Sequence, residues 1–432
     1  MRLLLLTHYY APEYGAPQRR WSALVERFLA VGHRVTVAAP VPHYPAGRPT
    51  PTQRRSHRRG AEERGRHGET IVRTAYLAHR ADIASRTADH VIAAGDALRR
   101  LRRRFRRPED RPDVIIATAP AIPTLLVGRL LSALWGVPLV VEMRDAWPDL
   151  VTHVGPAGAL SADAAEQVHA GALRRALAWA VALAKGEVHQ QVTSWQSGAR
   201  AVVTTTGRFA QVLRERGVDP VQVVRNGTDL SLVPPQRDHL PGDHPELRCL
   251  YLGNMGRSQG LDTVVRAAAV LHREGVDVQV RMVGHGVEAP ALAALAFELG
   301  APVEVIPRIP HREVGRQYAW ADTVIVSLRD WAPFAWTVPS KLYEMLATGR
   351  HITALLDGEA ADVVREAEAG DVLPPEDVPA LTALWRELAA DRSRAGVRAS
   401  GRAWVADHAD DDVLARRYLE ILTGVLPEHP ST

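Results

Sequence analysis

The stretch TVPSKLYEMLATGR, residues 337–350, holds one of only two lysines in a chain with 53 basic residues. Pro339 is favourable at the start of a helix, and Ser340 offers a hydroxyl of the kind that caps one. On that helix Lys341 and Glu344, three residues apart, share one face. An ammonium beside free helix amides suits a diphosphate, and a carboxylate suits sugar hydroxyls. The alternative is a surface ion pair of small energetic value, for which arginine would serve equally well.

A second candidate anion site is the glycine-rich stretch GNMGRSQG, which follows a predicted strand and precedes a predicted helix. Gly256 lets the backbone approach an anion, and Arg257 adds a guanidinium that matches phosphate geometry. The alternative is a tight strand–helix turn with a solvated arginine. The stretch also contains G-x-S-x-G, but several residues separate the strand from Ser258, which argues against a nucleophile elbow. The turn GHGVE, with Gly284, is a weaker instance of the same glycine pattern.

Two loops in the first half of the chain carry further candidates. Arg144 and Asp145 lie at the carboxyl end of a predicted strand, in VEMRDAWPD. Carboxylates beside arginine also occur in ordinary ion-pair networks, so this cluster has a structural alternative. Gly15 and Arg19 precede a predicted helix in THYYAPEYGAPQRR, which would also fit an ordinary βα loop. Open parallel sheets bind ligands at the carboxyl ends of their strands, and all four residues occupy such positions.

Several motifs are missing from the sequence. It has no zinc-ligand spacing, no Walker A motif and no G-x-G-x-x-G after the first predicted strand, which argues against metallohydrolases, P-loop NTPases and dehydrogenases. The single cysteine, Cys249, excludes an internal disulfide framework and fits a reducing compartment. The N-terminal MRLLLLTHYYAPEYG has four consecutive leucines and no small-residue cleavage site, so we expect a buried strand there and not a signal peptide.

Short apolar runs alternate with amphipathic segments along the chain. Several of the runs are nearly continuous, as parallel strands buried on both faces should be. This alternation predicts the α/β fold class, with two Rossmann-like domains facing a central cleft. The predicted strands lie in 3–9, 33–40, 69–77, 113–120, 138–145, 199–206, 221–227, 248–256, 277–286, 302–309, 322–328 and 350–358.

At 432 residues the chain is long enough for two domains. We expect residues 1–225 to form the N-terminal domain, the proline-rich stretch 226–246 to be a linker, and residues 247–405 to form the C-terminal domain. A C-terminal helix, 411–426, is expected to pack back onto the N-terminal domain. The arginine-rich stretch 45–68 is predicted to be a mobile loop.

The net charge of +4 is unevenly divided along the chain. The first 225 residues carry 33 basic and 19 acidic residues, a charge of +14, and the remainder carries 20 and 30, a charge of −10. The two halves are therefore expected to meet different partners.

The densest part of the positive charge is the run LRRLRRRFRRPEDR, residues 98–111. Leu98, Leu101 and Phe105 have helical spacing, which favours a basic amphipathic helix on an anionic membrane surface; a plain solvated helix is the alternative. No nucleic-acid motif accompanies the run, so nucleic acid is not expected as a partner. The apolar stretch 119–141 is interrupted by prolines and glycines and is interpreted as a loop, a buried helix and a strand, with no membrane span.

Taken together, these motifs resemble those of one protein family, the retaining family-4 glycosyltransferases of the GT-B fold. The chain is most similar to the bacterial branch that builds cell-surface polysaccharides and lipid-linked glycans. The matching segments are THYYAPEYGAPQRRWSALVERFLAVGHRVTV, VVEMRDAWPD, VVRNGTDL, YLGNMGRSQGLDTVV, MVGHGVE and VPSKLYEMLATGR.

The resemblance implies a nucleotide-diphosphate sugar as the donor, held mainly by the C-terminal domain. Arg257 and Lys341 would bind the diphosphate, and Glu344 would hold the ribose. Gly284 and Arg308 would lie near the base. No metal or other cofactor would be needed, because side-chain cations and helix N-termini neutralise the leaving diphosphate.

The same resemblance assigns the other candidates. Gly15 and Asp145 would face the transferred sugar or the acceptor, and Asp145 would be a catalytic residue together with the two diphosphate ligands. Further substrate contacts would come from Arg19, Arg144, Gly256 and Ser340.

Four positions depart from the family pattern. Gln259 and Gly260 follow the glycine turn where many relatives have a lysine, so Lys341 must carry more of the charge. Trp336 stands where relatives often have a second glutamate, and His285 stands where they often have Asp or Asn.

The expected function is retaining transfer of a hexose or N-acetylhexosamine to an acceptor hydroxyl of a lipid-linked glycan or another cell-envelope precursor. The alternatives are a GT-B nucleotide-sugar 2-epimerase, a glycosyltransferase that modifies a soluble secondary metabolite, and a non-catalytic binder of membranes or nucleic acid. The expected location is the cytoplasm, with peripheral binding at the inner face of the cytoplasmic membrane.

Overall fold

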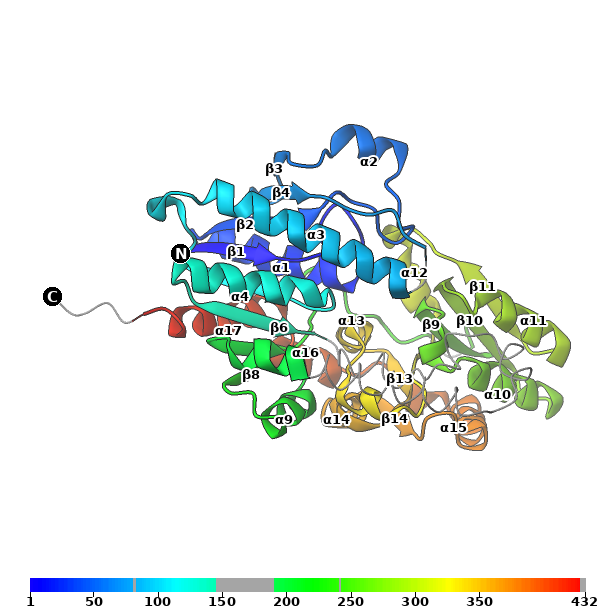
Figure 1. The fold of residues 1–432 in the computed structure, drawn as a ribbon. Helices are drawn as coiled ribbons and strands as arrows, with labels where there is room; N and C mark the ends of the chain where they lie inside the picture. The colour runs from blue at the N-terminus through cyan, green and yellow to red at the C-terminus, as the bar shows by residue number, and fades with distance from the viewer. Residues whose placement is uncertain (81–82, 145–189, 241, 428–432) are drawn as a thin grey trace, which may run out of the picture. The chain divides into compact units, whose positions relative to one another are not determined.

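The computed structural model describes residues 1–80, 83–144, 190–240 and 242–427. The chain forms two compact units, drawn as ribbons in Figure 1. The first consists of Met1–Arg225 together with Leu414–Thr432, and the second of Asn226–Val413.

The first unit is built on an eight-stranded sheet in the order β3-β4-β2-β1-β5-β6-β7-β8. All neighbouring strands pair in parallel except the edge pair β3 and β4. The central strands are almost entirely buried, which explains their continuous apolar sequences. The strands are β1 Arg2–Leu6, β2 Arg34–Pro40, β3 Glu62–Arg64, β4 Thr70–Thr74, β5 Val114–Thr118, β6 Leu139–Met143, β7 Ala201–Thr204 and β8 Val221–Val223.

The described helices of the first unit are α1 Ala16–Ala30, α2 Pro51–Ser56, α3 Ile83–Arg104, α4 Ile122–Trp135 and α9 Gly207–Glu215. The last helix of the chain, α17 Asp411–Gly424, joins the same hydrophobic core through its apolar residues. The ring of Tyr418 lies edge-on to Trp21, with 5.6 Å between the centroids, and 5.9 Å from Phe28 of α1. This apolar packing attaches the end of the chain to the first unit.

The second unit has a six-stranded, fully parallel sheet in the order β11-β10-β9-β12-β13-β14. Its strands are β9 Leu247–Asn254, β10 Val278–His285, β11 Val303–Pro307, β12 Thr323–Ser327, β13 His351–Leu355 and β14 Gly370–Leu373. Its α-helices are α10 Asp262–Arg273, α11 Ala289–Leu299, α12 His311–Trp320, α13 Ser340–Thr348, α14 Gly358–Glu366, α15 Val378–Ala390 and α16 Ser400–His408. Both units are thus parallel α/β domains, as the sequence predicts.

Each predicted strand overlaps an observed one, but the short strands β3 and β14 were not predicted. The stretch 45–68 is not a plain loop, because it contains α2, which Thr50 caps, and the antiparallel strand β3. Part of the expected linker is hydrogen-bonded within the second unit: the Gln236 amide donates to the carbonyl oxygen of Thr348 at 2.8 Å.

The basic run forms the end of an amphipathic helix, as predicted, but its apolar face does not meet a membrane. Leu101 and Phe105 are 0% and 6% exposed, because the apolar face of α3 packs into the core of the first unit. The ring of Phe105 lies edge-on to Trp135 of α4, with 5.5 Å between the centroids. These apolar side chains are therefore not available to lipid. Within the described ranges, no helix is both long and apolar enough to cross a membrane.

Candidate functional site

The loops after β9 and β10 approach each other so closely that only glycine fits at two positions. A Cβ atom on Gly284 would lie 1.8 Å from the carbonyl oxygen of Gly253, and one on Gly286 would lie 2.1 Å from that of Met255. The Met255 amide donates to the carbonyl oxygen of His285 at 2.7 Å, which joins the two loops. Gly284, which was expected to lie near the base, and Gly286 therefore allow the ends of β9 and β10 to approach each other closely.

The backbone of the loop after β9 is fixed by residues at the end of β12. The Ser327 hydroxyl donates to the carbonyl oxygen of Gln259 at 2.6 Å. The Arg329 amide donates to the carbonyl oxygen of Ser258 at 2.9 Å, and the Arg329 Nε donates to that of Arg257 at 2.7 Å. Ser258 lies in a one-turn 3-10 helix and not at a strand–helix elbow, so the structure gives no support to a serine nucleophile.

Arg257 extends its side chain into solvent from this fixed backbone, and the side chain is 68% exposed. Its Nε lies 3.5 Å from Oε1 of Glu288. The Gly256 amide donates to Oε1 of Gln259 at 3.0 Å, which tightens the turn before the arginine. An exposed guanidinium on an ordered backbone can bind an anion at a small cost in ordering.

The start of α13 brings Lys341 and Glu344 into contact. The Lys341 Nζ donates to Oε1 of Glu344 at 2.8 Å, and the Tyr318 hydroxyl donates to the same oxygen at 3.0 Å. Burial raises the pKa of Tyr318 well above its usual value, so its hydroxyl remains a donor. The expected capping role of Ser340 is wrong: Pro339 is the N-cap residue, and it makes no side-chain capping hydrogen bond.

These residues share one edge of the sheet. The strands β11, β10, β9 and β12 are consecutive neighbours and run parallel, so the loops after them emerge on the same side. Arg308, which is exposed, follows β11, and Gly284 lies near the end of β10. Arg257 follows β9, and Lys341 follows the segment after β12. The four loops thus present three cations, Arg257, Arg308 and Lys341, and a glycine turn at this edge.

Gly15 and Arg19 lie at the N-terminus of α1 in the first unit. Gly15 is the N-cap residue, and its carbonyl oxygen accepts a hydrogen bond from the Arg19 amide at 2.9 Å. The side chain of Arg19 is exposed, whereas the next residue, Arg20, is buried and lies 3.1 Å from Oε2 of Glu142. Arg20 also donates to the carbonyl oxygen of Val224 at 3.0 Å, so this second arginine stabilises the fold.

Arg144 is 7% exposed and follows β6. Its carbonyl oxygen accepts a hydrogen bond from the Thr205 hydroxyl at 2.7 Å, and its Nε lies 3.5 Å from the carbonyl oxygen of Ala119. Asp145, the next residue and a predicted catalytic group, lies outside the described residues.

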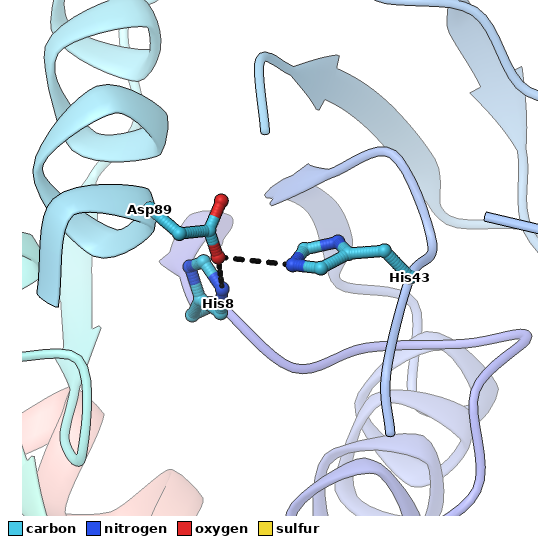
Figure 2. Close-up of side chains that lie close together, drawn as sticks. All are labelled: His8, His43 and Asp89. Carbon is cyan, nitrogen blue, oxygen red and sulfur yellow. Dashed lines mark hydrogen bonds and ion pairs between the residues drawn. The ribbon is translucent and has the colours of Figure 1, made fainter. Parts of the chain in front are cut away.

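A cluster of titratable side chains that motif spacing did not predict lies at the carboxyl ends of inner strands of the first sheet. His8 and His43 each place Nε2 at 2.9 Å from the same oxygen, Oδ2 of Asp89, as Figure 2 shows. The second carboxylate oxygen accepts a hydrogen bond from the Leu77 amide at 2.6 Å. The three side chains come from positions far apart in the sequence, so no local spacing indicated them.

Burial and hydrogen bonding shift the pKa values of these three groups in opposite directions. Burial lowers the pKa of His8. Burial would also lower the pKa of His43, but its hydrogen bonds to Asp89 and to the Val41 carbonyl outweigh burial and raise it. Burial would raise the pKa of Asp89, but the hydrogen bonds from both imidazoles bring it well below its usual value.

Comparison with known proteins gives matches to sugar-transferring enzymes. Residues 246–391 match the family model of the glycosyl transferases group 1. A GDP-mannose-dependent alpha-(1-6)-phosphatidylinositol monomannoside mannosyltransferase from Mycolicibacterium smegmatis is 29% identical over 188 residues, 42% of this chain and 49% of that protein. The chain spans about half the length of the curated relatives it matches.

Two solved structures match the fold over nearly the whole chain. Sucrose-phosphate synthase from Thermosynechococcus elongatus has a TM-score of 0.69 and 17% identity, with 98% of each chain covered. Anabaena HepE in complex with UDP-glucose has a TM-score of 0.65 and 14% identity, with 98% of this chain and 100% of the other covered. Residues 246–391 are therefore similar to the group 1 glycosyl transferases, and the chain as a whole has the two-domain GT-B fold of these solved structures.

Proposed function

We propose that this protein transfers a sugar from a nucleotide-diphosphate sugar to an acceptor hydroxyl, with retention of configuration. The observation that carries the proposal is the start of α13, where Lys341 lies beside helix amides that the N-cap residue, Pro339, does not cap with its side chain. Arg257 presents a second cation from an adjacent loop at the same edge of the sheet. The group 1 family match covers this part of the chain.

In the proposed complex, Arg257 and Lys341 neutralise the charge that develops on the leaving diphosphate. Lys341 and Tyr318 both bind Oε1 of Glu344, which orients the carboxylate toward ribose hydroxyls. Gly284 and Arg308 border the base. The acceptor hydroxyl attacks from the face that the diphosphate leaves, and a phosphate oxygen takes its proton. Because side chains neutralise the leaving group, we propose that the transfer needs no divalent cation.

On the acceptor side, we propose that Gly15, Arg19 and Arg144 contact the transferred sugar or the acceptor, with Asp145 as the catalytic carboxylate. Gly15 and Arg19 support this role because they begin α1 at the carboxyl edge of the first sheet. The transferred group is proposed to be a hexose or an N-acetylhexosamine.

The test of the donor is a screen of nucleotide sugars, including GDP-mannose and UDP-glucose, followed by mass spectrometry of the products. Sugar transfer or slow release of free sugar from one donor is expected. Conversion of the donor to an altered sugar nucleotide without any acceptor would contradict the transferase and indicate an epimerase. The absence of any reaction, together with no binding of nucleoside diphosphates, would contradict both enzymes.

We also propose that the acceptor is lipid-linked and that the first unit binds the anionic inner surface of the cytoplasmic membrane. Leu126, Leu130 and Leu134 form an exposed apolar stripe on α4, with helical spacing. This helix packs against α3, whose C-terminus carries exposed arginines. Apolar side chains beside arginines suit the boundary between lipid head groups and acyl chains. The mannosyltransferase relative is named for a phosphatidylinositol-based acceptor.

Vesicle binding tests the membrane proposal. Anionic vesicles should bind the protein at low salt, and replacing the three leucines by serine should weaken the part of the binding that persists at high salt. If the protein does not bind anionic vesicles at low salt but glycosylates a small soluble acceptor, the membrane proposal is contradicted. That result would indicate a secondary metabolite as the acceptor.

A further inference from the structure

Four histidines surround Asp89 in the first unit. His8 follows β1, His43 follows β2 and His79 follows β4, and these three strands are neighbours in the sheet. Their carboxyl ends therefore meet at one place, and Asp89 projects toward it from α3 (Figure 2). The fourth histidine, His90, stacks edge-on against His8, with 4.4 Å between the ring centroids. The sheet order thus collects these side chains from distant parts of the chain.

The hydrogen bonds of the rings fix where their protons lie. A carbonyl oxygen only accepts, so the His43 Nδ1, 2.7 Å from the Val41 carbonyl oxygen, must donate. The His79 Nδ1 donates in the same way to the Arg80 carbonyl oxygen at 2.7 Å. A neutral ring then directs the Nε2 lone pair toward Asp89, whose Oδ2 lies 2.9 Å from the His43 Nε2 and 3.9 Å from that of His79.

Two lone pairs cannot face each other at this distance without a cation. The cation is either a second proton on His43 or a metal ion shared by the cluster. His8 and His43 are 3% and 2% exposed, and Asp89 is fully buried. With a second proton on His43, the Nε2–H groups of His8 and His43 would both donate to the single oxygen Oδ2, whereas a metal ion would bind both nitrogens and that oxygen at once.

We propose that His8 Nε2, His43 Nε2 and Asp89 Oδ2 bind a divalent transition-metal ion of the Zn²⁺ type, with His79 as a fourth ligand after a small side-chain movement. Two or three imidazoles and one carboxylate are a typical ligand set for Zn²⁺. The outer contacts are those expected around such a site: each of two rings donates Nδ1–H to a carbonyl, and the Leu77 amide holds the carboxylate.

The surrounding charges favour a cation. In the described part of the chain, the ion pairs of Asp89 are all with histidines. Glu13, 8% exposed, binds the same region: its Oε1 accepts hydrogen bonds from the amides of His43 and Tyr44 at 2.7 and 2.8 Å. Two buried carboxylates therefore offset the charge of a divalent ion.

A second cluster of two histidines and one aspartate, in the other unit, is a natural control. Oδ1 of Asp322 lies 3.7 Å from the His239 Nε2 and 3.5 Å from the His244 Nε2. Its Oδ2, however, accepts hydrogen bonds from the Arg392 guanidinium and, at 2.8 Å, from the Arg248 amide. Because a guanidinium already supplies the positive charge, we expect no metal at this cluster.

The proposed ion would connect the carboxyl ends of β1, β2 and β4 to α3 and so hold this edge of the first sheet together. It takes no part in the proposed chemistry at the donor site, which lies in the second unit. The inference is therefore independent of the proposed function.

The test uses the 432-residue chain without a histidine tag, freed of metal and titrated with Co²⁺ as a spectroscopic probe. One equivalent of Co²⁺ should bind, give visible absorption bands of a four-coordinate ion, and be displaced by Zn²⁺. His43→Gln and Asp89→Asn should abolish the bands, whereas the control His244→Gln should keep them. The milder variant His79→Gln, at the edge of the cluster, should weaken Co²⁺ binding about tenfold or more and leave the circular dichroism spectrum unchanged.

Two results would overturn the proposal. One is a folded wild-type protein that takes up no stoichiometric Co²⁺ or Zn²⁺ and whose His43 ring carries two protons by NMR. The other is equal metal uptake by wild type and His79→Gln together with loss of uptake in His244→Gln, which would place the ion in the second unit.

Discussion

The carboxyl edges of the two parallel sheets differ in how they carry charge. In the second unit the cations are open to solvent: the side chain of Arg257 is 68% exposed and that of Lys341 is 31% exposed. In the first unit Arg19 is exposed, but the neighbouring charged groups are buried and paired, as Arg20 is with Glu142 at 3.1 Å. An anionic substrate can neutralise the solvent-exposed cations of the second unit and so bind at that edge. The buried ion pairs in the first unit instead maintain the fold.

The largest effect should come from breaking the buried pair of the first unit. Glu142→Ala leaves Arg20 without its carboxylate in a site where both side chains are at most 5% exposed. The free energy of unfolding should fall by about 3–5 kcal/mol, measured by chemical denaturation. Glu26→Ala removes an exposed partner 4.0 Å from Arg27 and should change stability little. Equal losses of unfolding free energy in the two variants would contradict the distinction between buried and solvent-exposed ion pairs.

Removing the solvent-exposed cations of the second unit should lower catalytic activity and leave the free energy of unfolding almost unchanged. Lys341→Ala should lower kcat/KM about 100-fold or more, because it removes a cation proposed to stabilise the leaving diphosphate, and Arg257→Ala should act similarly. Lys341→Arg should also be impaired, since a guanidinium does not replace a compact ammonium. Arg266→Ala, an exposed arginine on α10, is the control. Wild-type activity in both alanine variants would place the diphosphate elsewhere.

The arginines at the end of α3 should contribute smaller, separate increments to membrane binding. Neutralising each one should weaken binding to phosphatidylglycerol vesicles at low salt by about 1 kcal/mol, an effect that added salt screens. The residues to neutralise are Arg102, Arg103, Arg104, Arg106 and Arg107. Donor binding should not change in these variants.

Exposed arginines of the second unit provide the matched control for that experiment. Arg312→Gln and Arg365→Gln remove side chains that are 84% and 60% exposed. They should leave vesicle binding unchanged. If they weaken it as much as the changes in α3 do, net charge and not a membrane-facing surface of the first unit is responsible.

Removal of divalent cations should have the smallest effect, namely none on sugar transfer over a short assay. The proposed donor site neutralises the diphosphate with side chains, so activity should survive excess EDTA. Loss of activity that Mg²⁺ or Mn²⁺ restores in wild type and in His43→Gln alike would contradict the proposed chemistry. Loss that is confined to prolonged chelation of wild type would point instead to the histidine cluster of the first unit.

The sequence predicted the elements that follow from local pattern. Apolar runs indicated the buried strands. The two unpredicted strands lack such a run: β3 is EER at a sheet edge, and β14 is GDVL with all four residues half-buried. The contact of Lys341 with Glu344 was predictable because both lie on one helix face. The expected capping role of Ser340 was wrong, because Pro339 occupies the N-cap position and Ser340 is the first residue of the helix.

Contacts that depend on sheet order could not be read from the sequence. His8, His43 and Asp89 meet because β1 and β2 are neighbours and α3 passes over their ends, which no residue spacing records. Likewise the sequence shows two consecutive arginines, Arg19 and Arg20, and only the packing of α1 shows that Arg20 is buried against Glu142.

The most direct test of the donor site is the thermal unfolding of wild type and Lys341→Ala in the presence of nucleoside diphosphates. At 100 times its Kd, the cognate diphosphate should stabilise wild type by about 2.7 kcal/mol. The same concentration should give Lys341→Ala almost no stabilisation, while Arg266→Ala responds like wild type. Equal stabilisation of wild type and Lys341→Ala by that diphosphate would contradict the assignment of the open edge of the second unit as the donor site.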